Sequence, residues 1–419
     1  MGRPGLVALI AGMALAGCGS ARHGVVVQRE AEVRASTPVA HKFVAPVDAV
    51  ALRDGSSAFA GRLLGLVAGM QPGVAFSPLS ISDALAMTIP GARGRTARQI
   101  AAALDFRLPP ARLGAAFGAL DQSLGSANGP GVSLSVANAL YGQQGTAFRS
   151  AFLRLLASDY GAGIRVVDFV HAKEAARATI NGWVSERTHG KITSLLGARD
   201  IDVMTRLVLV NAVYLHAKWE SPFDAHATSP AVFHAPGGGV RVPTMHQSGS
   251  FGYARGQGYQ ALELPYSGGR LAFDVLLPNS GRMRTLLRRL GHRPLDLLRG
   301  LHQSPVDVSL PKLTLRTHFE LADALKALGI RLAFDPVRAD LSGIAGRPGD
   351  LYIGAAVHEA YLHVDEAGTE AAAATGVVLE AMSATALPSI RFDVNRPFVF
   401  LLRDRRTGAI LFLGTVSHP

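Results

Sequence analysis

The chain has 419 residues, of which 48% are hydrophobic and 17% charged, so it can bury a large core and is neither disordered nor fibrous. Its formal net charge of +11 comes mostly from arginine, because only six of the 42 basic residues are lysines. A nucleic-acid-binding protein normally concentrates such charge. Here the arginines are spread along the chain, so we expect no nucleic-acid partner.

The densest run of arginines lies near residue 290, with leucines between them at helical spacing. Its members are Arg282, Arg284, Arg288, Arg289 and Arg293. This spacing predicts the solvated face of an amphipathic helix rather than a polyanion site. The first third of the chain contains no dense basic helix, so activation by a glycosaminoglycan is not expected.

The N-terminus is typical of an export signal. Arg3 is followed by an apolar run, residues 6–15, that is too short to span a bilayer. The run "LAGC" then resembles the lipobox of bacterial lipoproteins, in which the cysteine is lipidated. We therefore expect residues 1–17 to be a lipoprotein signal peptide and Cys18 to carry a lipid that anchors the protein to a membrane. A plain secretory signal with a chance cysteine is the alternative.

Cys18 is the only cysteine, which removes disulfides and any catalytic or metal role for cysteine within the domain. The polar stretch 18–48 is interpreted as a flexible tether, so the protein would be extracytoplasmic, either anchored to the cell envelope or secreted. No long linker or repeat follows. We therefore expect one domain, residues 49–419, although the length would allow two or three.

From about residue 51, helical and strand patterns alternate. Helices are predicted at residues 58–69 and 80–89 from apolar residues spaced three and four apart. Strands are predicted at 134–142, 206–215, 259–266, 270–278, 306–315, 360–368, 398–404 and 409–416. Because helices cluster early and strands dominate later, we expect an α+β fold with large antiparallel or mixed sheets.

Enzyme motifs are missing from the sequence. There is no G-x-S-x-G, H-E-x-x-H or P-loop, and the G-x-G-x-x-A at residues 256–261 precedes a strand instead of opening a helix. His358 and His363 are five apart in a predicted strand, so they should face opposite ways and share no metal. We expect no enzyme activity, cofactor or metal, although spacing alone does not exclude a Ser-His-Asp triad assembled from distant positions.

Residues 365–383, "DEAGTEAAAATGVVLEAMS", contain four consecutive alanines. If this segment were a strand, one face would be small and then apolar, with Thr369, Ala371, Ala373, Thr375, Val377 and Leu379. A segment that enters an existing sheet needs small, uncharged side chains on the face that becomes buried. A flexible Ala/Gly linker or a poor helix fits the same composition, which does not decide between these interpretations.

Ten runs of residues from about position 50 to Pro419 follow the order of one known family. They include "FSPLSISDALAM" at 76–87, "TRLVLVNAVYLHAKWESPF" at 205–223 and "HEAYLHVDEAGTEAAAAT" at 358–375. On these runs the chain resembles the serpins, a family of serine protease inhibitors. The resemblance implies a large central mixed or antiparallel sheet, two smaller sheets, about eight or nine helices and an exposed reactive-centre loop at about 366–390.

The resemblance also implies a mechanism. A serine protease cleaves the loop, its hinge inserts into the central sheet, and the acyl-enzyme is trapped. The implied hinge residues are Glu366, Gly368, Thr369, Glu370, Ala371, Ala372, Ala373, Ala374 and Thr375. The reactive bond would be Met382–Ser383, or one residue earlier at Ala381. An unbranched apolar methionine suits elastase-, chymotrypsin- or subtilisin-like proteases.

The same resemblance assigns residues around the point where the central sheet opens. Ser77, Ser80, Asn211 and His358 match the polar shutter, Trp219 matches the breach, and Lys312 matches the partner of Glu366. We expect a monomeric, lipid-anchored bacterial serpin that inhibits serine proteases. The alternatives are a non-inhibitory serpin with a binding or chaperone-like role and, from another class, a hydrolase with a hidden triad.

Overall fold

A computed structural model describes residues 31–40, 42–370 and 389–419 of the chain. The expected signal peptide and Cys18 lie outside these described residues. So do the part of the expected hinge made of Ala371, Ala372, Ala373, Ala374 and Thr375, and the expected reactive bond Met382–Ser383.

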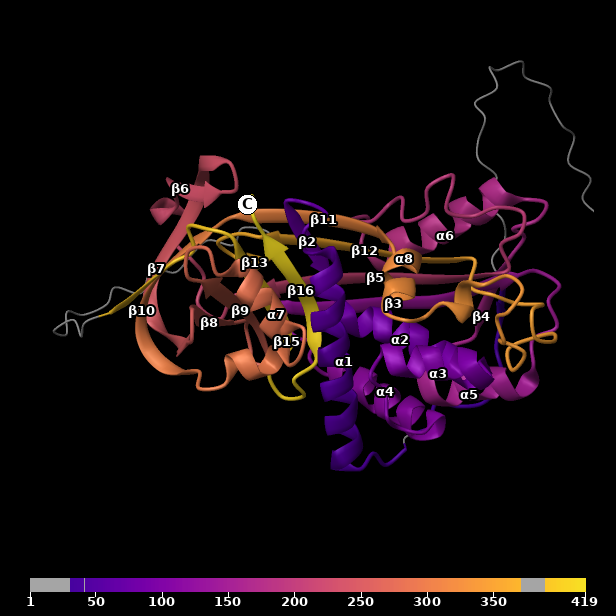
Figure 1. Ribbon diagram of the computed structural model, residues 1–419. Helices are drawn as coiled ribbons and strands as arrows, with labels where there is room; N and C mark the ends of the chain where they lie inside the picture. Colours follow the sequence, from indigo (N-terminus) through magenta and orange to yellow (C-terminus); the bar gives the residue numbers. More distant parts are fainter. Residues whose placement is uncertain (1–30, 41, 371–388) are drawn as a thin grey trace, which may run out of the picture.

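The described residues form eight α-helices and four short 3-10 helices (Figure 1). The α-helices are α1 (Pro46–Val67), α2 (Pro78–Thr88), α3 (Gly94–Ala103), α4 (Pro110–Gly125), α5 (Ser150–Tyr160), α6 (Lys173–Arg187), α7 (Met283–Leu290) and α8 (Ala322–Ala327). The 3-10 helices are η1 (Ile89–Gly91), η2 (Ala225–Ala227), η3 (Pro294–Leu298) and η4 (Leu332–Phe334).

The first sheet has seven strands and mixed direction. In order across the sheet they are β1 (Ala31–Val33), β4 (Ile164–Val167), β3 (Val132–Gln143), β5 (Leu207–Lys218), β13 (Gly368–Thr369), β12 (Ala355–Val364) and β11 (Leu313–Glu320). The pairs β3–β4 and β5–β12 are parallel, and the others are antiparallel.

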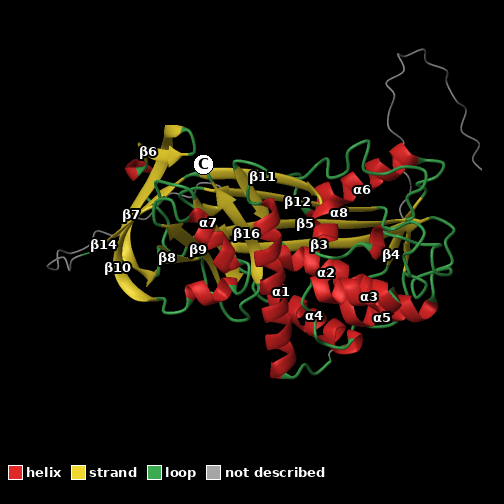
Figure 2. Ribbon diagram, viewed as in Figure 1, coloured by secondary structure: helices red, strands yellow, loops and turns green. Residues whose placement is uncertain are grey.

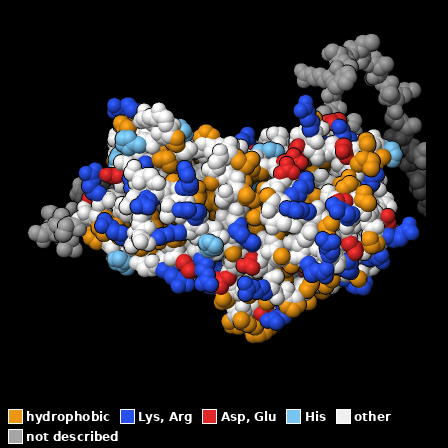
Figure 3. Space-filling model, viewed as in Figure 1, with side chains coloured by type: hydrophobic (Ala, Val, Ile, Leu, Met, Phe, Trp, Pro, Cys, Tyr) orange, Lys and Arg blue, Asp and Glu red, His pale blue; other side chains and the backbone are white. Residues whose placement is uncertain are grey.

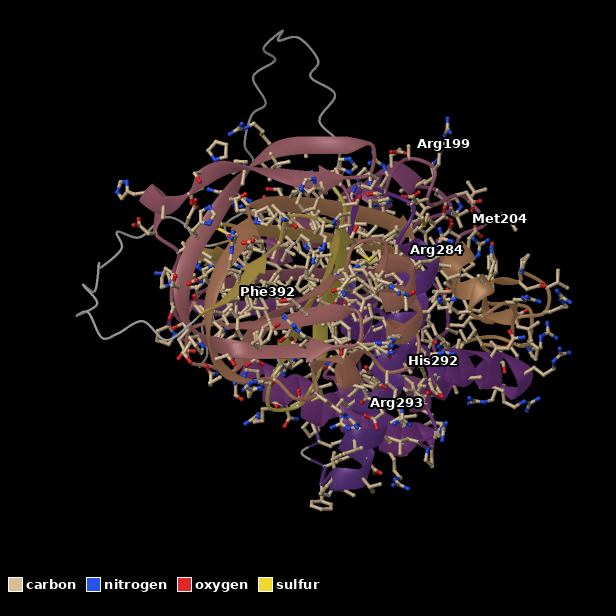
Figure 4. All side chains as sticks on the ribbon, turned by 60° about the vertical axis from the view of Figure 1, so that its left-hand side comes forward. Arg199, Met204, Arg284, His292, Arg293 and Phe392 are labelled. Atoms are coloured by element: carbon tan, nitrogen blue, oxygen red, sulfur yellow. The ribbon has the colours of Figure 1, made fainter. Side chains whose placement is uncertain are left out.

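The second sheet has nine strands. Its path is β14 (Ile390–Asp393), β10 (His302–Pro311), β7 (Gly238–Gly256), β8 (Tyr259–Pro265), β9 (Leu271–Pro278), β15 (Phe398–Asp404), β16 (Ile410–Val416) and β2 (Gly73–Phe76), with β6 (Ser229–Ala235) paired to β7. The long β7 pairs with β6, β8 and β10, so the two smaller sheets expected from the resemblance are continuous here. Phe392 of β14 is fully buried among the side chains of this region (Figure 4).

Helices cover both faces of the first sheet. On one face α6 packs against β3 and β5, and Trp183 of α6 meets the ring of Tyr141 edge-on. On the opposite face lies α2, with α3, α4 and α5 grouped at the same end of the molecule, whereas β6 to β10 lie at the other end (Figure 2). The α+β prediction is confirmed.

All the predicted strands form, and two of them differ from the prediction by more than a shift of one to three residues at an end. Residues 306–315 make two strands instead of one, because at Lys312 the chain passes from the second sheet to the first and its amide donates to the carbonyl of Pro243. The strand predicted at 360–368 ends at Val364, because the Asp365 carboxylate accepts hydrogen bonds from the amides of Ala367 and Gly368 and starts a turn.

The arginine-rich run forms α7 and the residues around it. Leu286 and Leu290 are buried, whereas Arg284 and Arg288 are exposed, so the amphipathic prediction is confirmed. Arginine and lysine side chains are scattered over the face seen in Figure 3 instead of forming one dense patch. The expected absence of a nucleic-acid partner stays a prediction.

The described part of the expected tether packs against the domain. The strand β1 forms the edge of the first sheet by pairing with β4, Lys42 forms an ion pair with the buried Asp159, and α1 already begins at Pro46. Within the stretch expected to be a tether, Ala31–Val33 thus adds a strand to the first sheet, and the domain boundary at residue 49 stays a prediction. Among residues 31–40, 42–370 and 389–419, no helix has the length and apolar character needed to cross a bilayer.

Two glycines of α1 make a matched test of this packing. A Cβ added at the buried Gly61 would overlap the Leu290 carbonyl oxygen of α7, so Gly61→Ala should lower the free energy of unfolding by about 2 kcal/mol. The exposed Gly65 has nothing within 4 Å of an added Cβ, so Gly65→Ala should raise it by about 0.5–1 kcal/mol through helix propensity. Urea unfolding measures both, and equal effects would contradict this packing of α1 on α7.

Candidate functional site

The candidate site lies where β5 and β12 meet. Residues 355–360 of β12 pair directly with residues 208–213 of β5 in parallel. Beyond these pairs the two strands separate, and the two residues of β13 lie between them, antiparallel to both (Figure 1). The sheet is thus closed along half of this seam and already holds the first residues of another strand at its end.

A tight turn at residues 365–368 places β13 in that gap. The Asp365 carboxylate accepts from the amides of Ala367 at 2.9 Å and Gly368 at 3.2 Å. Gly368 has φ of +152°, and a Cβ there would overlap the carbonyl oxygen of Ala217 on β5. Only glycine allows both this conformation and this approach of the backbone to β5.

Trp219 covers the turn. Its indole Nε1 donates to the carbonyl of Asp365 at 2.9 Å, and its own amide donates to the carbonyl of Ala367 at 3.0 Å. The ring stacks on Tyr266 with centroids 4.6 Å apart and an interplanar angle of 4°. Trp219 directly follows β5 in the chain and is only 3% exposed. Its two hydrogen bonds therefore hold the turn against the end of β5.

The side chain of Glu366 is held from two directions. Its carboxylate lies 2.8 Å from Lys312 Nζ and accepts from Thr228 Oγ1 at 2.8 Å. Burial works to raise the pKa of this carboxyl, but the hydrogen bonds from Lys312 and Thr228 and the Lys312 charge outweigh it, and the pKa is lowered from 4.5. The expected pairing of Glu366 with Lys312 is present.

Thr369 and Glu370 face opposite sides of the sheet. Thr369 is fully buried, with its hydroxyl 2.5 Å from that of Tyr266. The Glu370 carboxylate points the other way, 3.3 Å from Lys191 Nζ, and its carbonyl accepts from His216 Nδ1 at 2.6 Å. Glu370 also has φ of +57°, in the left-handed region, so the extended strand ends there.

Further along the seam, beneath the closed part of the sheet, His358 is fully buried. Its Nε2 accepts from the amide of Ser77 at 3.0 Å, at the start of α2. Burial, with a smaller contribution from the His318 charge, lowers the pKa of His358 to about 3, so the ring is neutral. Because Nε2 accepts, Nδ1 carries the proton, and this buried donor has no partner among the described residues.

Asn211 lies opposite His358 across the parallel pair and belongs to a second polar group. Its Nδ2 is 3.3 Å from both the Ser80 carbonyl and Asn138 Oδ1, and the Ser80 hydroxyl also donates to Asn138 Oδ1. Asn138 Nδ2 in turn donates to Asp83 at 2.6 Å. The structure therefore brings together Ser77, Ser80, Asn211 and His358 near one point of the seam.

Neither Asn138 nor Asp83 was predicted from the sequence as a member of this group. Both lie in largely apolar stretches, Asn138 in a predicted strand and Asp83 in a predicted helix. In the described part of the chain, no three His, Cys, Asp or Glu side chains are grouped as a metal site would require. His358 is buried and His363 is partly exposed and bonded to Thr314, so the prediction that they face opposite ways is confirmed.

Comparison with known proteins assigns this architecture. Residues 54–419 match the family model of the serpins, described as serine protease inhibitors. The chain is 39% identical to the leukocyte elastase inhibitor of Bos taurus over 354 residues, which cover 82% of this chain and 92% of that protein. The chain therefore belongs to the serpin family.

Solved structures agree with this assignment. The native state of tengpin, a thermophilic serpin, superposes with a TM-score of 0.84 at 27% identity over 94% of this chain and all of that one. Human thyroxine-binding globulin, solved with its hormone, superposes with a TM-score of 0.80 at 30% identity over 89% of this chain and 99% of that one. The relatives thus include a protein named as an elastase inhibitor and another named for binding thyroxine.

The ion pair at the hinge has a testable pH dependence. Because the pKa of Glu366 is lower in the folded chain than in the unfolded chain, its contribution is complete above about pH 5 and is lost as pH falls through the folded pKa. Glu366→Gln should therefore lower the free energy of unfolding by about 1 kcal/mol or less at pH 7, and this effect should shrink steadily as the pH is lowered below the unfolded pKa of Glu366 and through its folded pKa.

Urea unfolding at pH 7 and at lower pH values measures this change. Glu320→Gln is the matched control, because Glu320 is exposed on β11 and has no ion pair within the described residues. A deficit of Glu366→Gln that persists unchanged at low pH would show that the carboxylate charge does not hold the hinge.

Proposed function

We propose that the chain inhibits serine proteases as a suicide substrate, by inserting its cleaved reactive loop between β5 and β12. The observation that carries this proposal is β13, which already occupies the end of that seam while β5 and β12 remain paired beyond it. The relationship to a leukocyte elastase inhibitor supports the same function.

The register of β13 indicates where the inserted residues would lie. Thr369 is paired with Ala217 of β5 and Val364 of β12. Continuing both antiparallel ladders by six residues would pair Thr375 with Asn211 and with His358. Its hydroxyl would then arrive beside the Nδ1–H of His358, the buried donor that has no partner among the described residues. Insertion would give this donor an acceptor.

The hinge sequence fits this path. Side chains alternate across a strand, so Ala371, Ala373 and Thr375 would follow the buried Thr369 into the core. Alanine and threonine enter without displacing the packed residues there. Roughly a dozen new ladder hydrogen bonds at about 1 kcal/mol each would supply on the order of 10 kcal/mol to distort the attached protease.

The length of the loop decides how far the protease would move. From Gly368 to Met382 is 15 residues, which as a strand at ~3.4 Å each span about 50 Å. That distance is comparable to the diameter of the domain, roughly 50 Å. Cleavage at Met382–Ser383 would therefore carry the acylated protease from one end of the inhibitor to the other, and deacylation would stall.

A methionine at the reactive bond favours proteases with a medium apolar specificity pocket, of elastase, chymotrypsin or subtilisin type. A register one residue earlier would present Ala381, which also suits elastase. Lipidation at Cys18, as in bacterial lipoproteins, would anchor the inhibitor on the outer side of a membrane, where it would meet such proteases. We propose that it acts there as a monomer.

A non-inhibitory role is the second candidate, because thyroxine-binding globulin shares the fold. Bulky, charged or proline residues in the hinge would support it, since they obstruct insertion. The run 371–375 contains only alanine and threonine. The hinge therefore favours inhibition.

The proposed function can be tested by mixing the purified domain with elastase, chymotrypsin or subtilisin. The products are then separated on a denaturing gel and identified by intact mass. We expect a complex that survives denaturant and a released peptide that begins at Ser383. Cleavage of the loop without a complex would contradict inhibition and support the non-inhibitory role.

Substitution at the first buried hinge position tests insertion. Thr369→Arg would place a charge beside Tyr266 in the core, which costs far more than the hinge gains there. We expect the variant to be cleaved as a substrate, with the fraction trapped as complex at least about tenfold lower. Ala386→Arg adds the same charge beyond the reactive bond and should keep trapping, and equal trapping by Thr369→Arg would exclude the insertion route.

The reactive residue itself has a separate test. Met382→Arg should transfer inhibition to trypsin-like enzymes, whose specificity pocket is acidic, and should weaken inhibition of elastase and chymotrypsin. Met382→Leu keeps an apolar side chain of similar size and should retain the original preference. Rates of complex formation with trypsin and chymotrypsin measure the change, and unchanged selectivity would place the reactive bond elsewhere.

A further inference from the structure

A cavity of about 270 Å³ lies beside the polar group at the seam, between α2, α4, α5 and β3. Most of its lining is apolar, including Met87, Leu124 and Leu134, with the Tyr160 side chain among them. Two carboxylates line the same space, Asp83 from α2 and Asp121 from α4. The cavity is smaller than the roughly 300–1,000 Å³ of sites for drug-sized molecules, so it suits a fragment with one ring or a short chain.

Asp83 is the buried acid of the cavity. It is 6% exposed, and its Oδ2 accepts one hydrogen bond, from Asn138 Nδ2 at 2.6 Å. Its Oδ1 is buried without any hydrogen-bond partner in the described part of the chain. Burial raises the pKa of this carboxyl to about 6, although the bond from Asn138 works to lower it. A buried carboxylate oxygen of this kind normally has a donor or a cation beside it.

Asp121 lies on the exposed side of the same cavity. Desolvation, with a smaller contribution from the Asp83 charge, raises the pKa of the Asp121 carboxyl well above its usual value. Neither carboxylate forms an ion pair with a basic side chain among the described residues, whereas the neighbouring Asp159 is paired with Lys42. Both carboxyl groups therefore line an apolar space that contains no positive group within the described chain, and a cation there would favour their ionised forms.

We propose that this cavity binds a small organic cation with an apolar body, whose ammonium group lies between Asp83 and Asp121 and whose hydrocarbon part packs on Met87, Leu124 and Leu134. A bare metal ion fits less well, because the described residues bring no third His, Cys, Asp or Glu ligand to this space. An uncharged apolar molecule would leave both carboxylates without a positive partner and Asp83 Oδ1 without a hydrogen-bond donor.

Binding there has a consequence at the seam. Asn138 joins Asp83 to Ser80 and Asn211, because it donates to the first and accepts from the other two. A cation on Asp83 keeps that carboxylate ionised and hence holds Asn138 in the orientation that bonds to β5. The ligand should therefore stabilise the closed sheet and slow loop insertion. This consequence rests on the proposed function, whereas the binding does not.

Calorimetry on the purified chain at pH 7.5 tests the site with benzylammonium and, as an uncharged probe of the same shape, benzyl alcohol. We expect benzylammonium to bind at least about tenfold more tightly than the alcohol. Asp83→Asn and Asp121→Asn should each weaken it about tenfold or more. Asp323→Asn, at an exposed carboxylate paired with Lys326 on α8, is the control and should bind as the original chain does.

Equal binding of the two probes, binding of neither, or unchanged affinity in Asp121→Asn would overturn the proposal. If circular dichroism shows that Asp83→Asn does not fold, Asp121→Asn decides, because its position at the open side makes no packed contribution to the core. A chain that traps proteases normally but binds no benzylammonium would refute this site alone and leave the proposed function standing.

Discussion

The parallel pairing of residues 355–360 with 208–213 is the interaction on which the rest of the structure depends. It closes one half of the seam between β5 and β12. Four residues further along each of the two strands, β13 lies between them and shows that the seam can hold another strand. The turn at residues 365–368 directs the chain into that gap, and the left-handed residue Glu370 ends the strand. The left-handed backbone of Glu370 and its ion pair with Lys191 thus limit the segment between β5 and β12 to the two residues of β13.

Polar side chains lie under the closed part of the seam, where apolar side chains would give a lower free energy of the folded state. Asn211, Asn138, Ser80 and Asp83 satisfy one another only in part, and His358 keeps a donor without a partner among the described residues. Such groups cost free energy when buried. The closed sheet therefore contains a polar network with missing hydrogen bonds. It lies at the point where, in the proposed mechanism, an inserted strand would supply the missing partner.

Much of this site could be predicted from the sequence, because its residues lie in runs shared with the family. Gly368, Thr369 and the pairing of Glu366 with Lys312 belong to this group. Asp83 and Asn138 could not be predicted as part of the site, because their role depends on a hydrogen bond between a helix and a strand. The two residues lie 55 positions apart in the chain. The division of 306–315 into two strands was hidden for a similar reason, since Lys312 marks a change of sheet within an unbroken β pattern.

The most direct test of strand insertion is the thermal unfolding of the chain before and after a protease cuts residues 371–388 without remaining attached. If the freed hinge enters between β5 and β12, two new ladders replace one, and a gain on the order of 10 kcal/mol should raise the unfolding temperature by about 10 °C or more. An unfolding temperature that stays the same or falls after cleavage would contradict the account, because the cut loop would then have remained outside the sheet.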